Sequence, residues 1–484
     1  MSLQLLDTTM VDIPDVGHTV KIEVQGHNGN INHEGIILHP AAKGHITIKL
    51  PNGYNASYPV DAIISVEVTG KVAEVDGAGV NDVTMNESLP RVRIIHTGGT
   101  IASKVDYKTG AVIAKFEPAE IVASIPELAS IANIDAEKMG NMFSDDIRPQ
   151  HWNEIAQATK RAFDDGCYGV VITHGTDTLH ISSAAMCFAW SGKGERPPGP
   201  IAMVGSQRSS DRGSSDASEN LIAAVKWAAE GPKPSGECGD STVVIMHTSS
   251  HDGTCSVQPG TGVRKMHSTR RDAFQNVNSQ PLAYIDLRKG EPEIIIQDSY
   301  HEILDNANRE ICQKPTIFSP EVRIAQFIAG PWLHEQDIES VVSNGPQAIV
   351  IHGTGLGHLP IDDPRKDAPE NTKIWRVLTR CVNRNIPVIV TTQCINGPVD
   401  MNVYSKGRKQ QNMGFVSYES VFVDGSVDDQ LTSAFVYSGT DTVFHGEPLR
   451  GLNGNLYDPG EDISRHLKTE EIDKEKIFFS FQNN

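Results

Sequence analysis

The chain has 484 residues and a formal net charge of −19 at pH 7, with 38% hydrophobic and 21% charged residues. This composition is typical of a soluble globular protein of two or three domains, and it excludes a largely disordered chain. No run of about 18 apolar residues is present, which excludes a membrane-spanning helix, and the acidic balance disfavours a chain that grips nucleic acid alone. Seven scattered cysteines and the absence of a signal-like start predict reduced thiols and a cytoplasmic location.

The first 72 residues carry the alternation of apolar and polar side chains that is typical of short strands. The pattern is clearest at 20–24, 46–50 and 64–68, and turns containing Gly, Asn and Pro separate these runs. About five such strands in this length predict a small β-barrel of the SH3 or Tudor kind over residues 1–72. Residues 73–90 show no periodicity and are predicted to be a linker.

From residue 91 the pattern changes to alternating strands and helices. Strands are predicted at 91–95, 170–173, 201–204 and 243–246. Helices are predicted at 152–163, ending before Gly166, at 178–190 and at 221–228. This alternation predicts a parallel sheet covered on both faces, with functional residues at the carboxyl ends of its strands. We assign residues 91–290 to this first α/β domain.

A second, smaller α/β set begins near residue 321. Strands are predicted at 324–328, 348–351 and 388–390, with a helix around 374–378. Residues 291–320 are predicted to connect the two lobes, and residues 321–484 form the smaller domain with an atypical tail. The fold class is therefore a two-lobed α/β protein with a parallel sheet, preceded by a small all-β barrel.

Three polar clusters follow strands of the first α/β lobe. The first is His-Thr-Gly-Gly-Thr at 96–100, the second is Thr-His-Gly-Thr-Asp-Thr at 173–178, and the third contains Lys265. Taken singly, each is explained as a tight turn, a helix cap or a solvated lysine. Taken together they suit covalent catalysis, because a threonine nucleophile needs a base and a lysine beside a carboxylate can supply one.

The run His-Thr-Gly-Gly-Thr-Ile-Ala at 96–102, paired with His-Gly-Thr-Asp-Thr at 174–178, resembles the two threonine signatures of the L-asparaginase family. The resemblance implies that Thr100 is the nucleophile and that Thr176, Asp177 and Lys265 activate it. The implied substrate-binding residues are Ser144, Asp145, Tyr107, Gly99 and Ser206, with Ser144 at the α-carboxylate and Tyr107 on a lid. Which of the two threonines forms the covalent bond stays open.

A narrower resemblance covers roughly residues 15–415. The barrel, Asn-Gly-Tyr-Asn at 52–55, Arg-Lys-Met-His at 264–267 and Arg-Asp-Ala-Phe at 271–274 are similar to the family of D-type subunits of archaeal glutamyl-tRNA(Gln) amidotransferases. This resemblance implies a homodimer core within a heterotetramer, where this chain hydrolyses glutamine and binds no cofactor. The partner, the E-type subunit of the amidotransferase, would receive the ammonia, bind ATP and Mg²⁺, and hold most of the Glu-tRNA(Gln).

Two other functions remain open at this stage. One is a stand-alone asparaginase or glutaminase, and the other is an inactive scaffold whose barrel binds RNA or a partner. A metal site at His247 and His251 is disfavoured because no HExxH glutamate accompanies them, so no metal ligands are assigned. The Gly-Thr-Asp-Thr run at 439–442 is treated as coincidental, because the residues after it cannot begin a helix.

Overall fold

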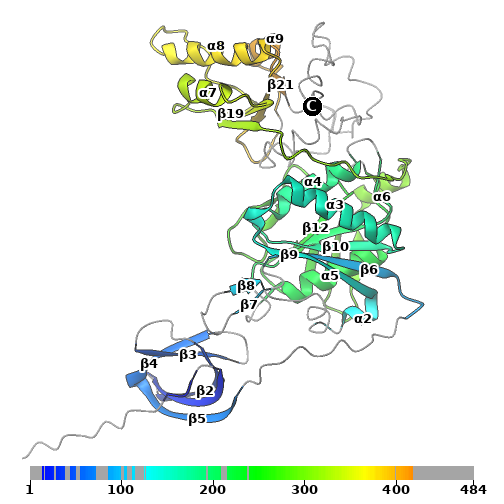
Figure 1. Cartoon of the computed structure of the whole chain (residues 1–484), viewed down its shortest axis with the longest axis vertical. Helices are drawn as coiled ribbons and strands as arrows, with labels where there is room; N and C mark the ends of the chain where they lie inside the picture. The colour runs from blue at the N-terminus through cyan, green and yellow to red at the C-terminus, as the bar shows by residue number, and fades with distance from the viewer. Residues whose placement is uncertain are drawn as a thin grey trace, which may run out of the picture.

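The computed structural model describes residues 13–15, 17–26, 29–38, 44–50, 55–71, 86–99, 103–105, 112–114, 125, 127–191, 195–208, 215–236, 239–397 and 399–417. Figure 1 follows these residues from the N-terminal strands to the short strand β21. The predicted α/β class, with an all-β sheet at the N-terminus, is confirmed by the sheets that they form. Within the described part of the chain, no helix is long and apolar enough to cross a membrane.

The N-terminal unit is a five-stranded antiparallel sheet. Its strands are β1 (His18–Gly26), β2 (Gly29–Leu38), β3 (His45–Lys49), β4 (Asn55–Pro59) and β5 (Ile63–Lys71), and the short helix η1 (Val60–Ala62) links the last two. Their order is β4-β3-β2-β1-β5, and the alternating side chains Val20, Ile22 and Val24 are buried in its core. No β4–β5 pairing occurs among the described residues, so closure into a barrel stays a prediction.

The large lobe is built on an eight-stranded sheet with the order β17-β16-β13-β12-β11-β10-β6-β9. Five neighbouring strands are parallel, and they are β6 (Arg91–Gly98), β9 (Asn133–Met142), β10 (Gly169–Thr173), β11 (Ile201–Val204) and β12 (Val243–His247). Their helices are α2 (Leu128–Ile131), α3 (Pro149–Asp164), α4 (Leu179–Ser191) and α5 (Ala217–Glu230), with the short helix η3 (Ser144–Asp146) before α3. The four predicted strands and three predicted helices of this lobe are confirmed.

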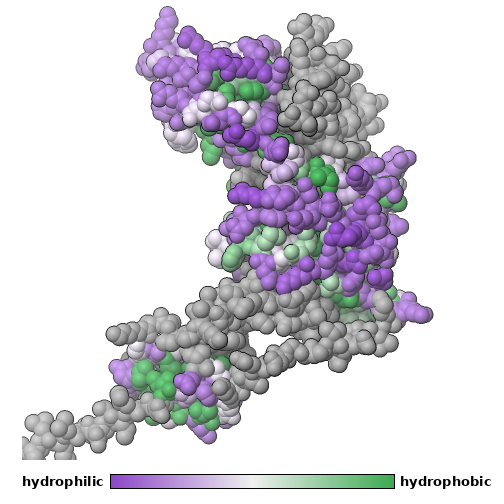
Figure 2. All heavy atoms as spheres, in the orientation of Figure 1, coloured by the Kyte–Doolittle hydropathy of each residue, from purple (hydrophilic) through white to green (hydrophobic). Residues whose placement is uncertain are grey.

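Both faces of the parallel part are covered, because successive side chains of a strand point to opposite faces. In β10, Val170 and Ile172 join the core cluster that contains α3 and α4. Val171 joins the opposite cluster, which contains α2 and α5. Helix α3 ends at Asp164, before Gly166 as the sequence predicted, and Gly166 has a φ of +83° that glycine adopts most readily. On the face shown in Figure 2, most of the described surface of this lobe is hydrophilic.

The large sheet is mixed, because three antiparallel strands that the sequence analysis did not predict extend its parallel part beyond β12. They are β13 (Thr254–Pro259), β16 (Ala283–Asp286) and β17 (Glu293–Ile296). Strand β17 and helix α6 (Asp298–Asp305) lie within 291–320, which was predicted to be a connection. Tyr300 of α6 is buried in the core of the large lobe, so this lobe continues past residue 290.

Two small antiparallel pairs accompany the large sheet. Strand β14 (Val263–Lys265) pairs with β15 (Phe274–Asn276), and β7 (Ser103–Val105) pairs with β8 (Val112–Ala114). The β14–β15 hairpin carries the lysine that the sequence singled out. Its strand β14 contacts α4 and its strand β15 contacts β13, so the hairpin lies against the large sheet without joining it.

The smaller lobe is a four-stranded parallel sheet with the order β18-β19-β20-β21. Its strands are β18 (Ile324–Ile328), β19 (Ala348–Gly353), β20 (Val388–Thr392) and β21 (Val416–Ser417), and its helices are α7 (Glu335–Val342), α8 (Pro369–Asn383) and α9 (Ser405–Asn412). The predicted strands and helix of this lobe are confirmed, and residues 418–484, which contain the atypical tail, lie outside the described residues.

Direct contacts join the two lobes. The segment that leads to the smaller lobe is fixed to α3: Trp152 makes an edge contact with Phe318 at a ring-centroid distance of 5.7 Å, and the Asn153 side chain donates to the Phe318 carbonyl at 2.7 Å. Asn278, which follows β15, accepts a hydrogen bond of 2.8 Å from the backbone N–H of Gly397 in the smaller lobe. The hairpin region of the large lobe is therefore tied to the loop after β20.

Candidate active site

The two threonine signatures lie side by side because β6 and β10 are parallel neighbours. Thr173, at the end of β10, is directly opposite His96 in the register of the two strands. The Thr173 hydroxyl lies 2.7 Å from His96 Nδ1, and the Thr97 hydroxyl donates to the Thr173 carbonyl at 2.9 Å. The structure thus brings the start of both signatures to one edge of the sheet, as the strand pattern predicted.

Glycines allow the two signature loops to touch backbone to backbone. Gly99 has a φ of +86°, and a Cβ atom built on it would lie 2.5 Å from the Gly175 nitrogen. Gly175 is equally confined, since a Cβ there would lie 2.8 Å from Cβ of Ser144. Thr100, the next residue after Gly99, lies outside the described residues, as does Tyr107. Their implied roles stay predictions.

One amine joins the second signature to the third polar cluster. Lys265 Nζ donates to the Thr176 hydroxyl at 2.8 Å and to Asp177 Oδ1 at 2.7 Å. The Thr176 residue and the Lys265 side chain are 7% and 9% exposed, whereas the Asp177 side chain is 70% exposed. A hydroxyl and a carboxylate held by one nearly buried amine form the arrangement that proton transfer to or from a nucleophile requires.

Lys265 owes its position to the β14–β15 hairpin rather than to a strand of the large sheet. It is the last residue of β14 and faces Phe274 across the pair. The next ladder bond runs from the Met266 N–H to the Ala273 carbonyl at 2.6 Å. Val263 and Phe274 are buried, so apolar packing holds both strands of the hairpin in place.

Ser144 lies against the same loop. It is 4% exposed, its hydroxyl accepts a 3.3 Å hydrogen bond from the Thr178 N–H, and its carbonyl accepts one of 2.6 Å from the Thr178 hydroxyl. Its neighbour Asp145 is exposed. The structure therefore groups Ser144 with Gly99, Thr176, Asp177 and Lys265, and places Asp145 next to this group.

Ser206 lies in the turn after β11, and its implied role in substrate binding stays a prediction. The residue is fully buried, and its hydroxyl donates to Asp216 Oδ1 at 2.8 Å and also bonds the Arg208 carbonyl. Asp216 accepts further hydrogen bonds from the N–H groups of Gln207 and Arg208. Because its hydroxyl is used inside this turn, Ser206 supports the loop after β11, and the structure gives no basis for a substrate contact through its hydroxyl.

His174, within the second signature, is neutral at ordinary pH. Complete burial lowers the pKa of its imidazole from 6.5 to about 4, because the charged ring would lose its hydration. Its Nδ1 lies 2.7 Å from the carbonyl oxygen of Gly175, to which the neutral ring donates. The side chain therefore fixes the backbone before Thr176 without adding a charge to the site.

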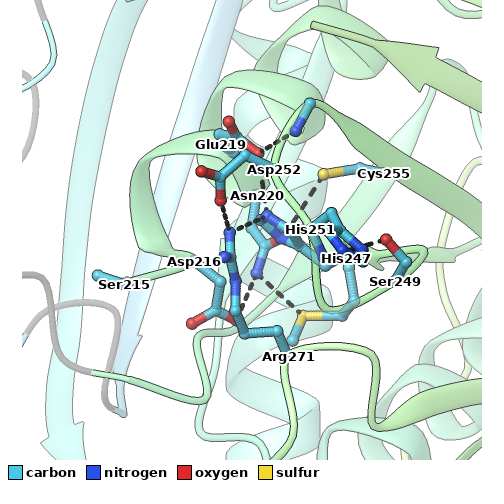
Figure 3. A network of polar contacts seen from close by, with 12 residues as sticks. Ser215, Asp216, Glu219, Asn220, His247, Ser249, His251, Asp252, Cys255 and Arg271 are labelled. Atoms are coloured by element: carbon cyan, nitrogen blue, oxygen red, sulfur yellow. Dashed lines mark hydrogen bonds and ion pairs between the residues drawn. The ribbon is translucent and has the colours of Figure 1, made fainter. Parts of the chain in front are cut away.

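A second polar group lies beside this region. Ligand atoms of Glu219, His247 and Asp252 all lie within 4.8 Å of one another, which is compatible with a metal site. Figure 3 shows the guanidinium of Arg271 reaching into the same group, and its Nη2 lies 2.6 Å from His247 Nε2. The arginine already supplies a positive charge there, which disfavours a metal ion.

Most residues of this second group could not be recognised from local patterns. Arg271 was noted only as part of a family-like run. Asp216 and Asn220 offered a faint signal, because polar residues four apart at the start of the otherwise apolar helix α5 lie on its buried face. A buried polar pair on such a face indicates a hydrogen-bonded network, since buried polar groups are almost always paired.

The chain matches two families of known proteins. Residues 91–299 match the family described as "Asparaginase, N-terminal", and residues 322–421 match "Glutaminase/Asparaginase C-terminal domain". The thermostable L-asparaginase from Thermococcus kodakarensis has a similar structure, with a TM-score of 0.54 and 26% identity over 72% of this chain and 98% of that protein. The first match extends across β17, in agreement with its place in the large sheet.

Two curated relatives are similar over most of their length. The D-type subunit of the Pyrococcus abyssi glutamyl-tRNA(Gln) amidotransferase is 37% identical, covering 84% of this chain and 87% of the relative. The protein of the same name from Methanosarcina mazei is 36% identical, covering 83% and 89%. This chain therefore belongs to the asparaginase family, in the branch formed by the D-type subunits of glutamyl-tRNA(Gln) amidotransferases.

Proposed function

We propose that this chain hydrolyses glutamine as the glutaminase subunit of a tRNA-dependent amidotransferase, supplying the ammonia that converts Glu-tRNA(Gln) into Gln-tRNA(Gln). The observation that carries the proposal is the bond of Lys265 Nζ to both Thr176 and Asp177, at the edge where the two threonine signatures meet. The names of the relatives support the choice of glutamine and of the amidotransferase over other amide substrates.

The chemistry follows from a hydroxyl beside an amine. In its neutral form Lys265 takes the proton of a threonine hydroxyl, and the threonine oxygen attacks the side-chain amide carbon of glutamine. The C–N bond breaks, the nitrogen takes up the proton and leaves as ammonia, and an ester links the glutamyl group to the threonine. Water then attacks the ester, so that glutamate leaves and the hydroxyl is restored. Thr100 and Thr176 both remain candidates for the covalent step.

The remaining reaction would belong to another chain. Activating the glutamate of Glu-tRNA(Gln) needs ATP and Mg²⁺, which we assign to a partner, the E-type subunit, together with most of the tRNA contact. The net charge of −19 supports this division, because a strongly acidic chain repels a phosphate backbone. We further propose a homodimer of this chain at the centre of a heterotetramer.

The decisive experiment measures ammonia release from glutamine and from asparagine by the full-length chain. It is done alone, with the partner subunit, and with the partner subunit and Glu-tRNA(Gln). Strong stimulation of glutamine hydrolysis by the complex is expected. Rapid asparagine turnover without stimulation would favour a stand-alone asparaginase, an alternative that the Thermococcus kodakarensis structure supports. Absence of turnover under all conditions would favour an inactive scaffold.

A matched pair of variants tests the role of the amine. Lys265→Met removes the contact with Thr176 and should lower kcat by about 10²- to 10⁴-fold, the usual contribution of a general base. Lys160→Met is the control, because Lys160 of α3 makes a comparable 2.8 Å bond to an aspartate, Asp164, and lies outside the group of site residues. Equal activity of the two variants would show that the site is assigned to the wrong residues.

A further inference from the structure

We propose that Arg271 is a positioning residue whose buried guanidinium anchors the β14–β15 hairpin and thereby holds Lys265 against Thr176. The inference rests on the proposed function, because it concerns the placement of the proposed base. Arg271 lies in the turn between the two strands, two residues before Ala273, which closes the turn by its bond to Met266. A shift of this turn would therefore move the end of β14, where Lys265 lies.

The guanidinium is held from several sides. The Arg271 side chain is 7% exposed, and it pairs with the carboxylate of Asp252, which is itself 73% exposed. It also donates to the Ser250 carbonyl at 3.4 Å, and its Nη2 lies 2.6 Å from His247 Nε2. Glu219 Oε2 lies 2.9 Å from the same ring nitrogen and adds a second negative charge to the group. A planar guanidinium can satisfy these directions at once, whereas the single ammonium of a lysine cannot. The turn is thus attached to the loop after β12 and to the end of β12 itself.

Asn220 fixes the orientation of the His247 ring, which Arg271 contacts. Asn220 donates its amide hydrogens to the Gly205 carbonyl and to Asp216 Oδ2, both at 3.0 Å, which fixes the amide so that Oδ1 faces His247 Nδ1 at 2.6 Å. Asn220 Oδ1 can only accept, so His247 Nδ1 carries a hydrogen and donates to it. This fixes the ring so that Nε2 faces Arg271 Nη2 at 2.6 Å and Glu219 Oε2 at 2.9 Å. Figure 3 shows this chain of contacts between Asn220, His247 and Arg271.

The same network also contacts the backbone next to Thr176, the residue that accepts the hydrogen bond from Lys265. Asn220 bonds the carbonyl of Gly205, the residue directly after β11. Gly205 lies so close to the second signature that a Cβ built on it would be 2.9 Å from Cγ2 of Thr176. One buried network therefore holds the hairpin that carries Lys265 and the backbone that packs on Thr176. This arrangement sets the distance between the amine and the hydroxyl.

A neighbouring arginine provides a matched control. Arg270 is in the same turn and also pairs with a carboxylate, through Nε to Asp272 Oδ1 at 2.9 Å, but its side chain is 55% exposed. Its ion pair lies within the turn, so it does not attach the hairpin to β12. Arg270→Ala and Arg271→Ala each remove an arginine side chain from the same turn. Only Arg271→Ala detaches the hairpin from β12.

The test is the steady-state hydrolysis of glutamine by the full-length chain with its partner subunit. Arg271→Ala should lower kcat by about 10- to 100-fold, because a displacement of 1 Å can cost about 10²-fold in rate. Its KM should stay near the wild-type value. Arg270→Ala should keep the wild-type kcat. Asp252→Asn, at an exposed carboxylate, should lower kcat by less than Arg271→Ala, and it decides the matter if Arg271→Ala does not fold.

Three outcomes would overturn the proposal. They are wild-type kcat in both Arg271→Ala and Asp252→Asn, a loss in Arg270→Ala as large as that in Arg271→Ala, and a rise in KM with kcat unchanged. The last would indicate lost binding rather than a misplaced base. A wild-type complex that releases no ammonia from glutamine would instead overturn the proposed function, so the two failures are distinguishable.

Discussion

The contact between Gly99 and Gly175 can be tested by adding a single methyl group. In Gly99→Ala the new Cβ would lie 2.5 Å from the Gly175 nitrogen and 2.6 Å from its Cα, and both are backbone atoms that cannot rotate away. The φ of +86° adds the left-handed penalty of about 1–2 kcal/mol, and the overpacking costs about 1–3 kcal/mol more. We therefore expect the free energy of unfolding to fall by about 2–5 kcal/mol.

Gly166→Ala separates the two contributions. Gly166 has nearly the same φ, +83°, but no atom lies within 4 Å of its built Cβ, so only the left-handed penalty of about 1–2 kcal/mol applies. Urea unfolding of both variants measures the difference, and ammonia release measures its consequence at the site. Gly99→Ala should be the less stable and should lose activity. If the two variants match in stability and activity, the close approach of the loops does not matter.

Two further predictions concern stability. Because folding lowers the pKa of His174 to about 4, the unfolded chain binds a proton that the folded chain does not; stability therefore falls by about 2 kcal/mol from pH 7 to pH 5. Urea unfolding at pH 7 and at pH 5 should show this loss of stability in the wild type and a smaller loss in His174→Phe. Tyr300→Phe removes a 2.7 Å hydrogen bond to the buried Asp240 carboxylate, so the free energy of unfolding should fall by about 1.5–3 kcal/mol while activity stays unchanged. A fall of less than about 0.5 kcal/mol would contradict this prediction.

The parallel part of the large sheet could be predicted because its strands are short apolar runs bounded by helical patterns. Residues 170–173 and 201–204 are buried on both faces, so they read as strands without alternation. Connections of the βαβ type then place neighbouring strand ends at one edge. These rules predicted that His96 and Thr173 lie at the same edge of the sheet, whereas the direct pairing of β6 with β10 is seen only in the structure.

The antiparallel part could not be predicted, for a physical reason visible in β13. Its residues Ser256 and Gln258 are 4% and 1% exposed, although both are polar. Gln258 is accommodated by donating to the Ser256 hydroxyl at 2.9 Å and to the Phe274 carbonyl at 3.2 Å. The alternation of Cys255, Ser256, Val257 and Gln258 spans only four residues, the shortest run that indicates a strand, and it would predict that the polar face is exposed. Its neighbour β16, and β17 beyond it, are only four residues long and carry even less signal.

The candidate site combines the ends of parallel strands with the separate β14–β15 hairpin, and this explains which of its residues could be predicted from the sequence. The threonine signatures follow parallel strands, whose position the sheet itself dictates. Lys265 comes from a hairpin outside the eight-stranded sheet, so the strand order does not determine where its amine lies. That position must be set by side-chain contacts distant in sequence, among which the contact of Arg271 with His247 is deeply buried. The base of the proposed reaction is therefore the residue whose placement depends most on interactions that no local pattern reveals.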